Sequence, residues 1–474
     1  MEKERIMKLK TLAVAITAAT ISSSAFALDF NGYFRAGFGM NADGGSQFCY
    51  GNGGPDAHVV GRLGNECDTY AELSFSQNVV ERPTGEKFSI HTLVAYGTYE
   101  EFGFAGTRDT RGNSFQGVTG EAPEAGAETA GSPWSGQRLS FREAYAKYIM
   151  SSGMELWAGN RYYGRKDVHI NDWYYVNGSG YGVGVDNINV GLGQVAVAVR
   201  HTKWHDVSGG ADMRQNMAST PILDLRWKGV DVGLGSLDFI AMLGKANLSD
   251  AQEEGATDGQ YNDKTGFSGT IEWALGFSGG FNKLVAQYNT EGFAWSGYGM
   301  NNHLGDSYNI GNYNNGGDAQ LGRKSWRIID HGVASFGRSF DLGYSVFYSQ
   351  LDNPGSDEKG KRFGATVRPR FKWNDTMSTQ VEFGYYNQED PWEPESTDLK
   401  KVTIAQAWSP LKEKGGFWAR PEIRIFATHF FGSDKDNQWW DGAAGTENPE
   451  WGGYGTGVFD KSETMFGAQV EAWW

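Results

Sequence analysis

The sequence lacks any hydrophobic run long enough to cross a membrane as a helix. Its clearest apolar stretch covers residues 12–21, whereas a spanning helix needs about 20 apolar residues. Lipid tolerates only helices and closed barrels as spanning structures. If this chain crosses a membrane, it must therefore cross with strands.

Basic side chains are also in short supply. The whole chain has 57 acidic side chains against 42 basic ones. Binding to a phosphate backbone requires a basic face. The charge balance therefore argues against a nucleic-acid partner.

Proline is scarce beside glycine and aromatic residues. Twelve prolines, 67 glycines and an aromatic fraction of 14% favour many short strands and tight turns over helices. The mean hydropathy of −0.51 is compatible with a membrane barrel, because only alternate strand residues face lipid while the lumen and loops are polar.

The N-terminus is typical of a secretory signal. A basic start precedes apolar residues 12–21, and an A-x-A cleavage site follows at residues 25–27. We expect cleavage between Ala27 and Leu28, which leaves residues 28–474 as the mature chain.

Cysteine occurs only twice, as Cys49 and Cys67, eighteen positions apart. Because an exported chain folds in an oxidising compartment, we predict one disulfide that closes a glycine-rich loop. A two-cysteine metal site is the weaker alternative, and we expect neither a metal nor a cofactor.

Apolar and polar residues alternate at both ends of the mature chain. At its start Phe30 and Phe34 alternate with Tyr33 and Arg35, and residues 466–474 repeat the pattern. Both ends are therefore predicted strands. Pairing of the last strand with the first would close a barrel and remove an edge that is too costly in lipid.

The same alternation over residues 418–425 predicts another strand. One face would carry Trp418, Arg420 and Arg424, which a water-filled lumen accommodates. The period-2 pattern thus places Trp418, together with Tyr33 and Trp473, on the lumen face.

The rest of the mature chain fits strands separated by long polar segments. Residues 194–200, 284–288, 343–348 and 380–386 suit tilted crossings of about 9 to 11 residues. Segments 101–136, 289–322 and 432–460 are candidate external loops. We predict one domain, an all-β transmembrane antiparallel barrel of about 18 strands with long external loops and short periplasmic turns.

A series of motifs in colinear order covers nearly the whole mature chain. They are DFNGYFR (29–35), RLGNECDTYAE (62–72), FREA (141–144), WAGNRY (157–162), RKDVH (165–169), DWYY (172–175), GFNK (280–283), RIIDHG (327–332), MST (377–379), WARP (418–421) and the terminal WW. The series resembles the maltoporin family of sugar-specific outer-membrane porins, and it is far more specific than any single motif.

The resemblance implies an 18-stranded barrel that assembles as a homotrimer in the outer membrane of a Gram-negative bacterium. It also implies facilitated diffusion of maltose and maltodextrins along an aromatic stripe in the pore. By position, the stripe residues are Tyr33, Tyr70, Phe281, Trp418 and Trp473. The stripe residue that the family takes from a neighbouring subunit falls in a divergent segment, where Trp134 and Phe104 are candidates.

Opposite the stripe, the family places ionisable residues that hydrogen-bond sugar hydroxyls. The matching positions are Arg35, Arg62, Glu72, Arg142, Arg165, Asp167 and Asp172. Tyr174 matches the residue that narrows the channel. Lys166 stands where a histidine is expected, and alternation predicts that its side chain points away from the face of Arg165 and Asp167.

Other readings remain open. The pore could serve another oligosaccharide such as sucrose or a β-glucoside, or the barrel could be a general diffusion porin or a surface receptor. Aromatic residues at lipid interfaces and charges on porin walls also occur without any sugar-binding role. We expect no enzyme, although Asp330 and His331 with a serine would be the candidate hydrolase group.

Overall fold

The computed structural model describes residues 28–45, 47, 49, 58–99, 139–201, 219–255, 264–300, 322–354, 359–391, 393–414, 416–432 and 462–474. The expected signal peptide, residues 1–27, lies outside the described residues. So do Trp134, Phe104 and most of the candidate external loops.

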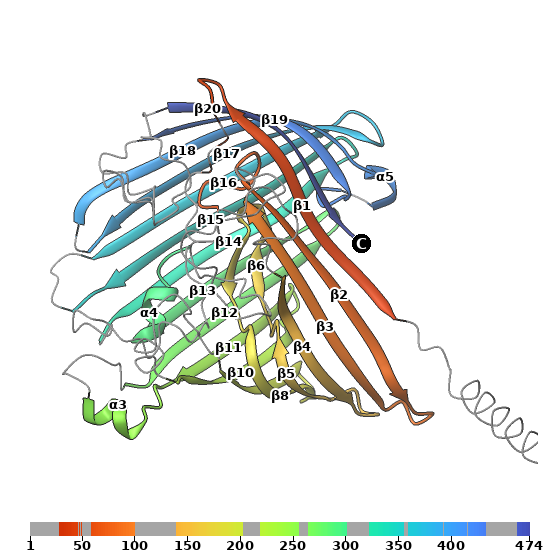
Figure 1. Cartoon of the computed structure of the whole chain (residues 1–474), viewed down its shortest axis with the longest axis vertical. Helices are drawn as coiled ribbons and strands as arrows, with labels where there is room; N and C mark the ends of the chain where they lie inside the picture. Colours follow the sequence, from red (N-terminus) through yellow and green to blue (C-terminus); the bar gives the residue numbers. More distant parts are fainter. Residues whose placement is uncertain are drawn as a thin grey trace, which may run out of the picture.

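Eighteen strands form one sheet (Figure 1). They are β1 (Asp29–Asn41), β2 (Asp68–Glu81), β3 (Lys87–Tyr99), β4 (Leu139–Ile149), β5 (Glu155–Arg161), β8 (Gly180–Asn189), β9 (Gln194–His201), β10 (Pro221–Asp231), β11 (Ser236–Gly244), β12 (Gly266–Phe277), β13 (Gly280–Thr290), β14 (Lys324–Phe336), β15 (Phe340–Asp352), β16 (Gly360–Lys372), β17 (Met377–Asp390), β18 (Glu393–Trp408), β19 (Glu422–Gly432) and β20 (Ser462–Trp473).

The sheet closes on itself because β1 pairs antiparallel with both β2 and β20. Tyr33 lies opposite Glu72 on one side and opposite Trp473 on the other. In Figure 1 the first strand, in red, runs beside the last, in dark blue. The predicted antiparallel barrel of about 18 strands is confirmed.

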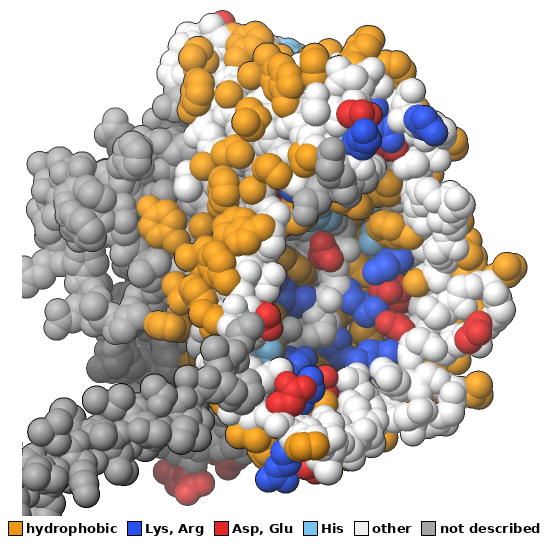
Figure 2. Space-filling view, turned by 90° about the vertical axis from the view of Figure 1, so that its right-hand side faces the viewer, with side chains coloured by type: hydrophobic (Ala, Val, Ile, Leu, Met, Phe, Trp, Pro, Cys, Tyr) orange, Lys and Arg blue, Asp and Glu red, His pale blue; other side chains and the backbone are white. Residues whose placement is uncertain are grey.

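Strand alternation separates two surfaces. On β10, Leu225 and Trp227 are each 37% exposed, whereas the alternate residues Asp224 and Arg226 are buried. Figure 2 shows the same division for the molecule, with hydrophobic side chains over the outer surface and charged ones gathered in the hollow. The outer surface is therefore suited to lipid and the inner one to water.

Helices are few and short in the described part of the chain. They are α3 (Asp250–Gly255), α4 (Gly292–Ser296), α5 (Leu411–Lys414) and the 3-10 turn η2 (His169–Asn171). Among these residues, no helix is long and apolar enough to span a membrane.

The predicted strand over residues 418–425 is wrong in its first half. Strand β19 begins only at Glu422, and Trp418 lies in the connection after α5. Pro421 cannot donate to a sheet ladder. Meanwhile Arg370 donates to the Phe417 carbonyl oxygen at 2.8 Å. This bond holds the segment inside the barrel instead of in its wall.

The connection between β5 and β8, residues 162–179, folds into the barrel and is called the inward segment below. It carries β6 (Lys166–Val168), η2 and β7 (Trp173–Val176), and Trp173 and Tyr175 on it are at most 1% exposed. The Tyr175 hydroxyl donates to Glu272 on β12 at 2.5 Å, and Gln287 on β13 donates to the Tyr175 carbonyl at 3.0 Å. These hydrogen bonds hold the segment against the lumen side of β12 and β13.

Residues 58–67, which belong to the connection between β1 and β2, also lie inside the barrel. The Lys401 ammonium donates to the carbonyls of Gly61 and Leu63, each at 2.7 Å, and to Glu382 at 2.6 Å. At the end of this segment Cys67 forms a disulfide with Cys49, so the predicted pairing is confirmed.

Candidate functional site

Three of the five predicted stripe residues meet where the barrel closes. The ring centroids of Tyr70 on β2 and Tyr33 on β1 lie 6.1 Å apart. Tyr33 and Trp473 on β20 lie 6.4 Å apart with an interplanar angle of 17°. Neighbouring inward positions on three adjacent strands therefore form a continuous aromatic surface.

His169 connects this surface to Trp418. Its ring lies 5.7 Å from that of Trp473 and 4.8 Å from that of Trp418, edge-on in both cases. Trp418 and Phe281 then line one cavity together with His169. All five predicted aromatic residues are partly exposed, as a surface that a ligand can reach must be.

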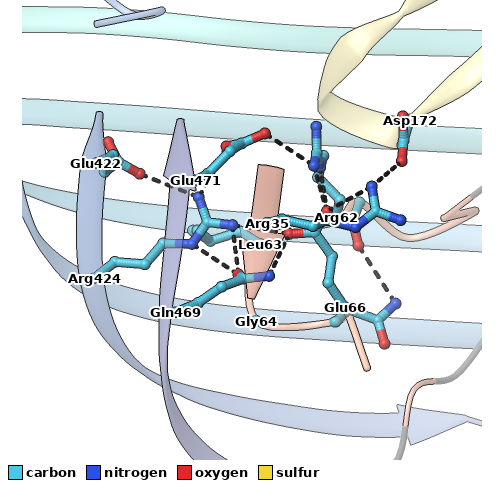
Figure 3. A network of polar contacts seen from close by, with 12 residues as sticks. Arg35, Arg62, Leu63, Gly64, Glu66, Asp172, Glu422, Arg424, Gln469 and Glu471 are labelled. Carbon is cyan, nitrogen blue, oxygen red and sulfur yellow. Dashed lines mark hydrogen bonds and ion pairs between the residues drawn. The ribbon is translucent and has the colours of Figure 1, made fainter. Parts of the chain in front are cut away.

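Two of the predicted hydrogen-bonding arginines belong to a buried ion-pair network (Figure 3). Arg35 pairs with Asp172 at 2.7 Å and with Glu66 at 3.5 Å. Arg62 pairs with Glu66 and, at 3.0 Å, with Glu471. Both arginines are at most 5% exposed.

Strand β19 and the connection that precedes it complete this network from the other side. Arg424 pairs with Glu66 at 2.8 Å, and Arg420 pairs with Glu471 at 2.6 Å. Burial alone would raise the pKa of Glu66, but the guanidinium groups of Arg62, Arg35 and Arg424 lower it to about 2. The carboxylate is therefore charged throughout the physiological range.

Arg62 also orients two rings of the aromatic path. It donates to the Tyr33 hydroxyl at 2.9 Å and to Nε2 of His169 at 3.3 Å. Since arginine can only donate, that nitrogen is the acceptor. Burial, followed by the nearby charge of Arg62, lowers the pKa of His169 to about 3, so the imidazole is neutral. Arg62 thus positions Tyr33 and His169 more than it offers donors to the lumen.

A second polar group surrounds Tyr162. Its hydroxyl donates to Glu72 at 2.9 Å and accepts from Arg142 at 2.8 Å. Glu72 also accepts from Tyr70 at 2.5 Å. These contacts join the predicted residues Glu72 and Arg142 to the stripe residue Tyr70.

Arg165 is stacked between two tyrosines. Its guanidinium carbon lies 4.0 Å from the ring centroid of Tyr162 and 3.7 Å from that of Tyr174. A flat guanidinium fits between aromatic faces, and such contacts are attractive. The stack fixes Tyr174, the predicted narrowing residue, on the inward segment.

Asp167 and Lys166 face different surroundings. The Asp167 side chain is 47% exposed and lines the cavity of Phe281 and Trp418. Lys166 pairs with Asp238 at 2.7 Å and with Glu272 at 2.9 Å, both on the barrel wall. Lys166 is therefore an anchor of the inward segment.

Sequence reasoning left several residues of the site unassigned. They include Glu66, His169, Arg420, Arg424 and Glu471. Glu66 and His169 lie within the matched motifs, and the alternation around Arg424 and Glu471 predicted inward side chains. No sequence signal gave their pairing, because the Arg424–Glu66 bond joins residues 358 positions apart.

Two arrangements could be taken for other chemistry. Ligand atoms of His58, Glu66 and Asp172 lie within 4.8 Å of one another, but Arg35 pairs with both carboxylates and occupies the place of a cation. Residues 276–280 have the spacing G-x-S-x-G, yet they form the turn from β12 to β13. A hydrolase nucleophile with this motif sits between a strand and a helix instead.

Comparison with known proteins identifies the family. Residues 28–474 match the LamB porin family. The maltoporin of Hahella chejuensis is 33% identical over 474 residues, which cover 99% of this chain and 98% of that protein.

Solved structures with a similar course of the chain were also found. OccAB1 of Acinetobacter baumannii is 9% identical, with 96% of this chain and 98% of that chain covered and a TM-score of 0.48. OpdK of Pseudomonas aeruginosa, solved with vanillate, is 8% identical, with 95% and 100% covered and a TM-score of 0.46.

The family match and the relative both extend over nearly all of the mature chain, and the closed barrel is the architecture of a channel. The chain belongs to the LamB porin family, the sugar-specific channels of the Gram-negative outer membrane.

Proposed function

We propose that this protein is a passive, saturable channel for maltose and maltodextrins. The observation that carries the proposal is a path of partly exposed rings. It runs from Tyr70 through Tyr33, Trp473, His169 and Trp418 to Phe281. Each glucose ring has an apolar face that can lie on an aromatic ring. A series of such weak sites lets a sugar both enter and leave.

Polar groups beside the path supply partners for the hydroxyls. Asp172 and Asp167 keep 17% and 47% of their side chains exposed, so their oxygens can accept hydrogen bonds. Arg165 and Arg142 are partly exposed donors. A moving sugar can therefore exchange hydrogen bonds without leaving polar groups unpaired.

The inward segment favours maltodextrins over the other candidate sugars. The Arg165 stack holds Tyr174 within the lumen, which supports a narrow pore of the maltodextrin type. A pore for sucrose or a β-glucoside would be expected to replace these residues with smaller ones. A general porin or a surface receptor would have no use for a continuous aromatic path.

Conductance in a planar bilayer tests the proposal. Maltotriose, maltohexaose and sucrose are titrated on the wild type, on Trp418→Ala and on the matched control Trp408→Ala. Trp408 is an outward-facing residue of β18 that is 39% exposed. We expect block that tightens with maltodextrin length and weakens about tenfold in Trp418→Ala, as truncation of an aromatic anchor predicts, with no change in Trp408→Ala.

Open current that is indifferent to all three sugars would reduce the protein to a general porin. Tighter block by sucrose than by maltotriose would support the alternative sugar. A receptor would keep its surface function in Trp418→Ala, since its loops and not its lumen would carry that function.

We also propose that residues 1–27 are a cleaved leader, that residues 28–474 form a single domain and that three barrels assemble side by side. The leader proposal rests on the A-x-A site before Leu28, and the trimer on the family resemblance. N-terminal sequencing of the membrane form and its mass in detergent test these two points.

A further inference from the structure

Two neighbouring turns of the barrel repeat one short sequence. The turn between β8 and β9 and the turn between β10 and β11 both read V-G-L-G, at residues 190–193 and 232–235. The four glycines of the two turns have φ values between 83° and 87°, so the turns share one backbone shape. Strands β9 and β10 pair with each other, which sets the two turns side by side. Short turns of this kind lie at the periplasmic end of outer-membrane barrels.

Both turns present a leucine to the surroundings. Leu192 is 66% exposed and Leu234 is 74% exposed, the two largest values among the large hydrophobic side chains of the described residues. Val190 and Val232 on the same turns are 50% and 48% exposed. A single exposed leucine needs no explanation. Two adjacent turns without a charged side chain between their valine and their last glycine form an apolar patch, and such a patch marks an interaction surface.

Each turn is attached to the outer surface of the barrel by a tryptophan. The indole nitrogen of Trp227 on β10 donates to the Leu192 carbonyl oxygen at 2.5 Å, and that of Trp273 on β12 donates to the Leu234 carbonyl oxygen at 2.7 Å. Trp227 lies on the outer surface, and so does Trp273, two positions from the exposed Ile271. The apolar patch is therefore continuous with the surface that faces lipid.

The surroundings of the two turns indicate their depth in the membrane. Tryptophan is enriched at the boundary between lipid and water, and an indole N–H that lies in lipid needs an acceptor within the protein. The carbonyl oxygens of the two turns supply that acceptor. Asp231 at the start of the second turn is exposed, and a carboxylate is costly in the hydrocarbon interior. The turns therefore suit the level where headgroups meet acyl chains.

We propose that these two turns insert Leu192 and Leu234 into the inner leaflet of the outer membrane, at the boundary between headgroups and acyl chains. The partner of the patch is thus a phospholipid surface, and the paired turns fix the height of this side of the barrel in the membrane. Continuity with the lipid-facing surface favours this partner over a soluble periplasmic protein. The proposal goes beyond the proposed function and holds whichever sugar the channel carries.

Single cysteines that carry a fluorescent probe test the proposal, because the two natural cysteines are joined in a disulfide. The variants are Leu192→Cys and Leu234→Cys, in vesicles whose phospholipids carry bromine near the headgroup end of the acyl chains. Ile271→Cys on the outer surface is the positive control. Ser151→Cys is the matched turn control, since Ser151 is an exposed residue of the polar turn between β4 and β5. We expect bromine to lower the emission about twofold at both leucine positions, as for groups at the membrane boundary, and to leave the emission at Ser151 unchanged.

Iodide dissolved on both sides of the membrane provides the opposite readout. We expect it to quench the probe at Ser151 and to leave the probes at Leu192 and Leu234 nearly unquenched. Quenching of both leucine positions by iodide and not by brominated lipid would overturn the proposal and leave the patch to a soluble partner. Lipid quenching at only one of the two would reject insertion of the pair. Only protein with the mobility of the folded barrel on an unheated gel is measured, and if one variant does not fold, the other decides alone.

Discussion

At the scale of single residues, the lumen separates side chains that hold the site from side chains that face the ligand. Glu66 is surrounded by Arg62, Arg35 and Arg424 and is 3% exposed. Such a carboxylate has lost its water, and its ion pairs compensate for that loss. Removal of one partner therefore lowers the free energy of unfolding by more than the intact ion pair adds to it.

Glu66→Gln should destabilise the barrel by about 3–5 kcal/mol, because it removes a buried carboxylate that three guanidinium groups share and leaves the network with an excess of buried positive charge. The matched control is Glu81→Gln, since the side chain of Glu81 is 46% exposed and pairs with Lys87. An exposed pair of this kind contributes at most about 1 kcal/mol. Urea unfolding of both variants in lipid vesicles measures the difference. Equal destabilisation would show that burial of the network does not determine its contribution.

The sequence could predict which residues belong to the site better than how they are held. The alternation of apolar and polar residues correctly predicted that Tyr33 and Trp473 lie on the opposite face of the sheet from Phe30. The motifs indicated Arg62 and Asp172 as candidate site residues. Period-2 patterns give a face but no partner, so Glu66 and Glu471 remained unassigned as the centre of the network. His169 was missed because a neutral histidine between two aromatic rings has no signature in sequence.

At the scale of elements, the alternation of apolar and polar residues predicted strands correctly in the barrel wall. It predicted a strand wrongly where the chain leaves the wall. The wall strands have a period of two because one side meets lipid and the other water. Segments 58–67 and 162–179 meet protein on several sides and therefore have no such period. Trp418 shows the consequence, because its apparent strand pattern continues through a segment that bends into the lumen.

The first of these segments should be sensitive to acid through His58. This side chain is 3% exposed, and neither ring nitrogen has a hydrogen-bond partner among the residues that the structure describes. Burial lowers its pKa from 6.5 to about 4. The unfolded chain then binds a proton more readily than the folded one. The stability contributed by neutral His58 is complete above about pH 6.5 and is lost as pH falls toward 4.

Between pH 7.5 and pH 5 this loss amounts to about 2 kcal/mol, from 1.36 kcal/mol per pKa unit. His58→Phe should remove that part of the pH dependence, since phenylalanine has a similar shape and takes up no proton. Unfolding free energies of the two proteins at both pH values provide the measurement. A wild type and a variant with the same pH dependence would show that the pKa of His58 is the same in the folded barrel as in the unfolded chain.

At the scale of the whole molecule, closure of the barrel and assembly of the stripe are one event. The pairing of β1 with β20 closes the sheet, and the same register sets Tyr33 opposite Trp473. The aromatic surface is therefore incomplete before the first and last strands meet, because Trp473 joins Tyr33 only across this pairing. Phe30 and Phe34 pack against Trp474 on the outer side of this seam.

The seam requires glycine at position 37, where the strands approach closely. A Cβ atom added there would lie 2.5 Å from the Ala468 carbonyl oxygen and 3.0 Å from the Gln469 Cα. Both are backbone atoms of β20, so neither can move without shifting the ladder. By contrast, a Cβ atom at Gly276 on β12 would meet nothing within 4 Å.

Gly37→Val should therefore lower the fraction of folded barrel, and it should weaken maltohexaose block in those channels that do close, because a displaced β20 moves Trp473 away from Tyr33. Gly276→Val introduces the same side chain into open space and should leave both properties unchanged. The folded fraction is read from the mobility of unheated protein on a denaturing gel, and block from bilayer conductance. A normal folded fraction with weakened block would still support the coupling, whereas normal values of both in Gly37→Val would show that the seam tolerates displacement and that the stripe does not depend on its register.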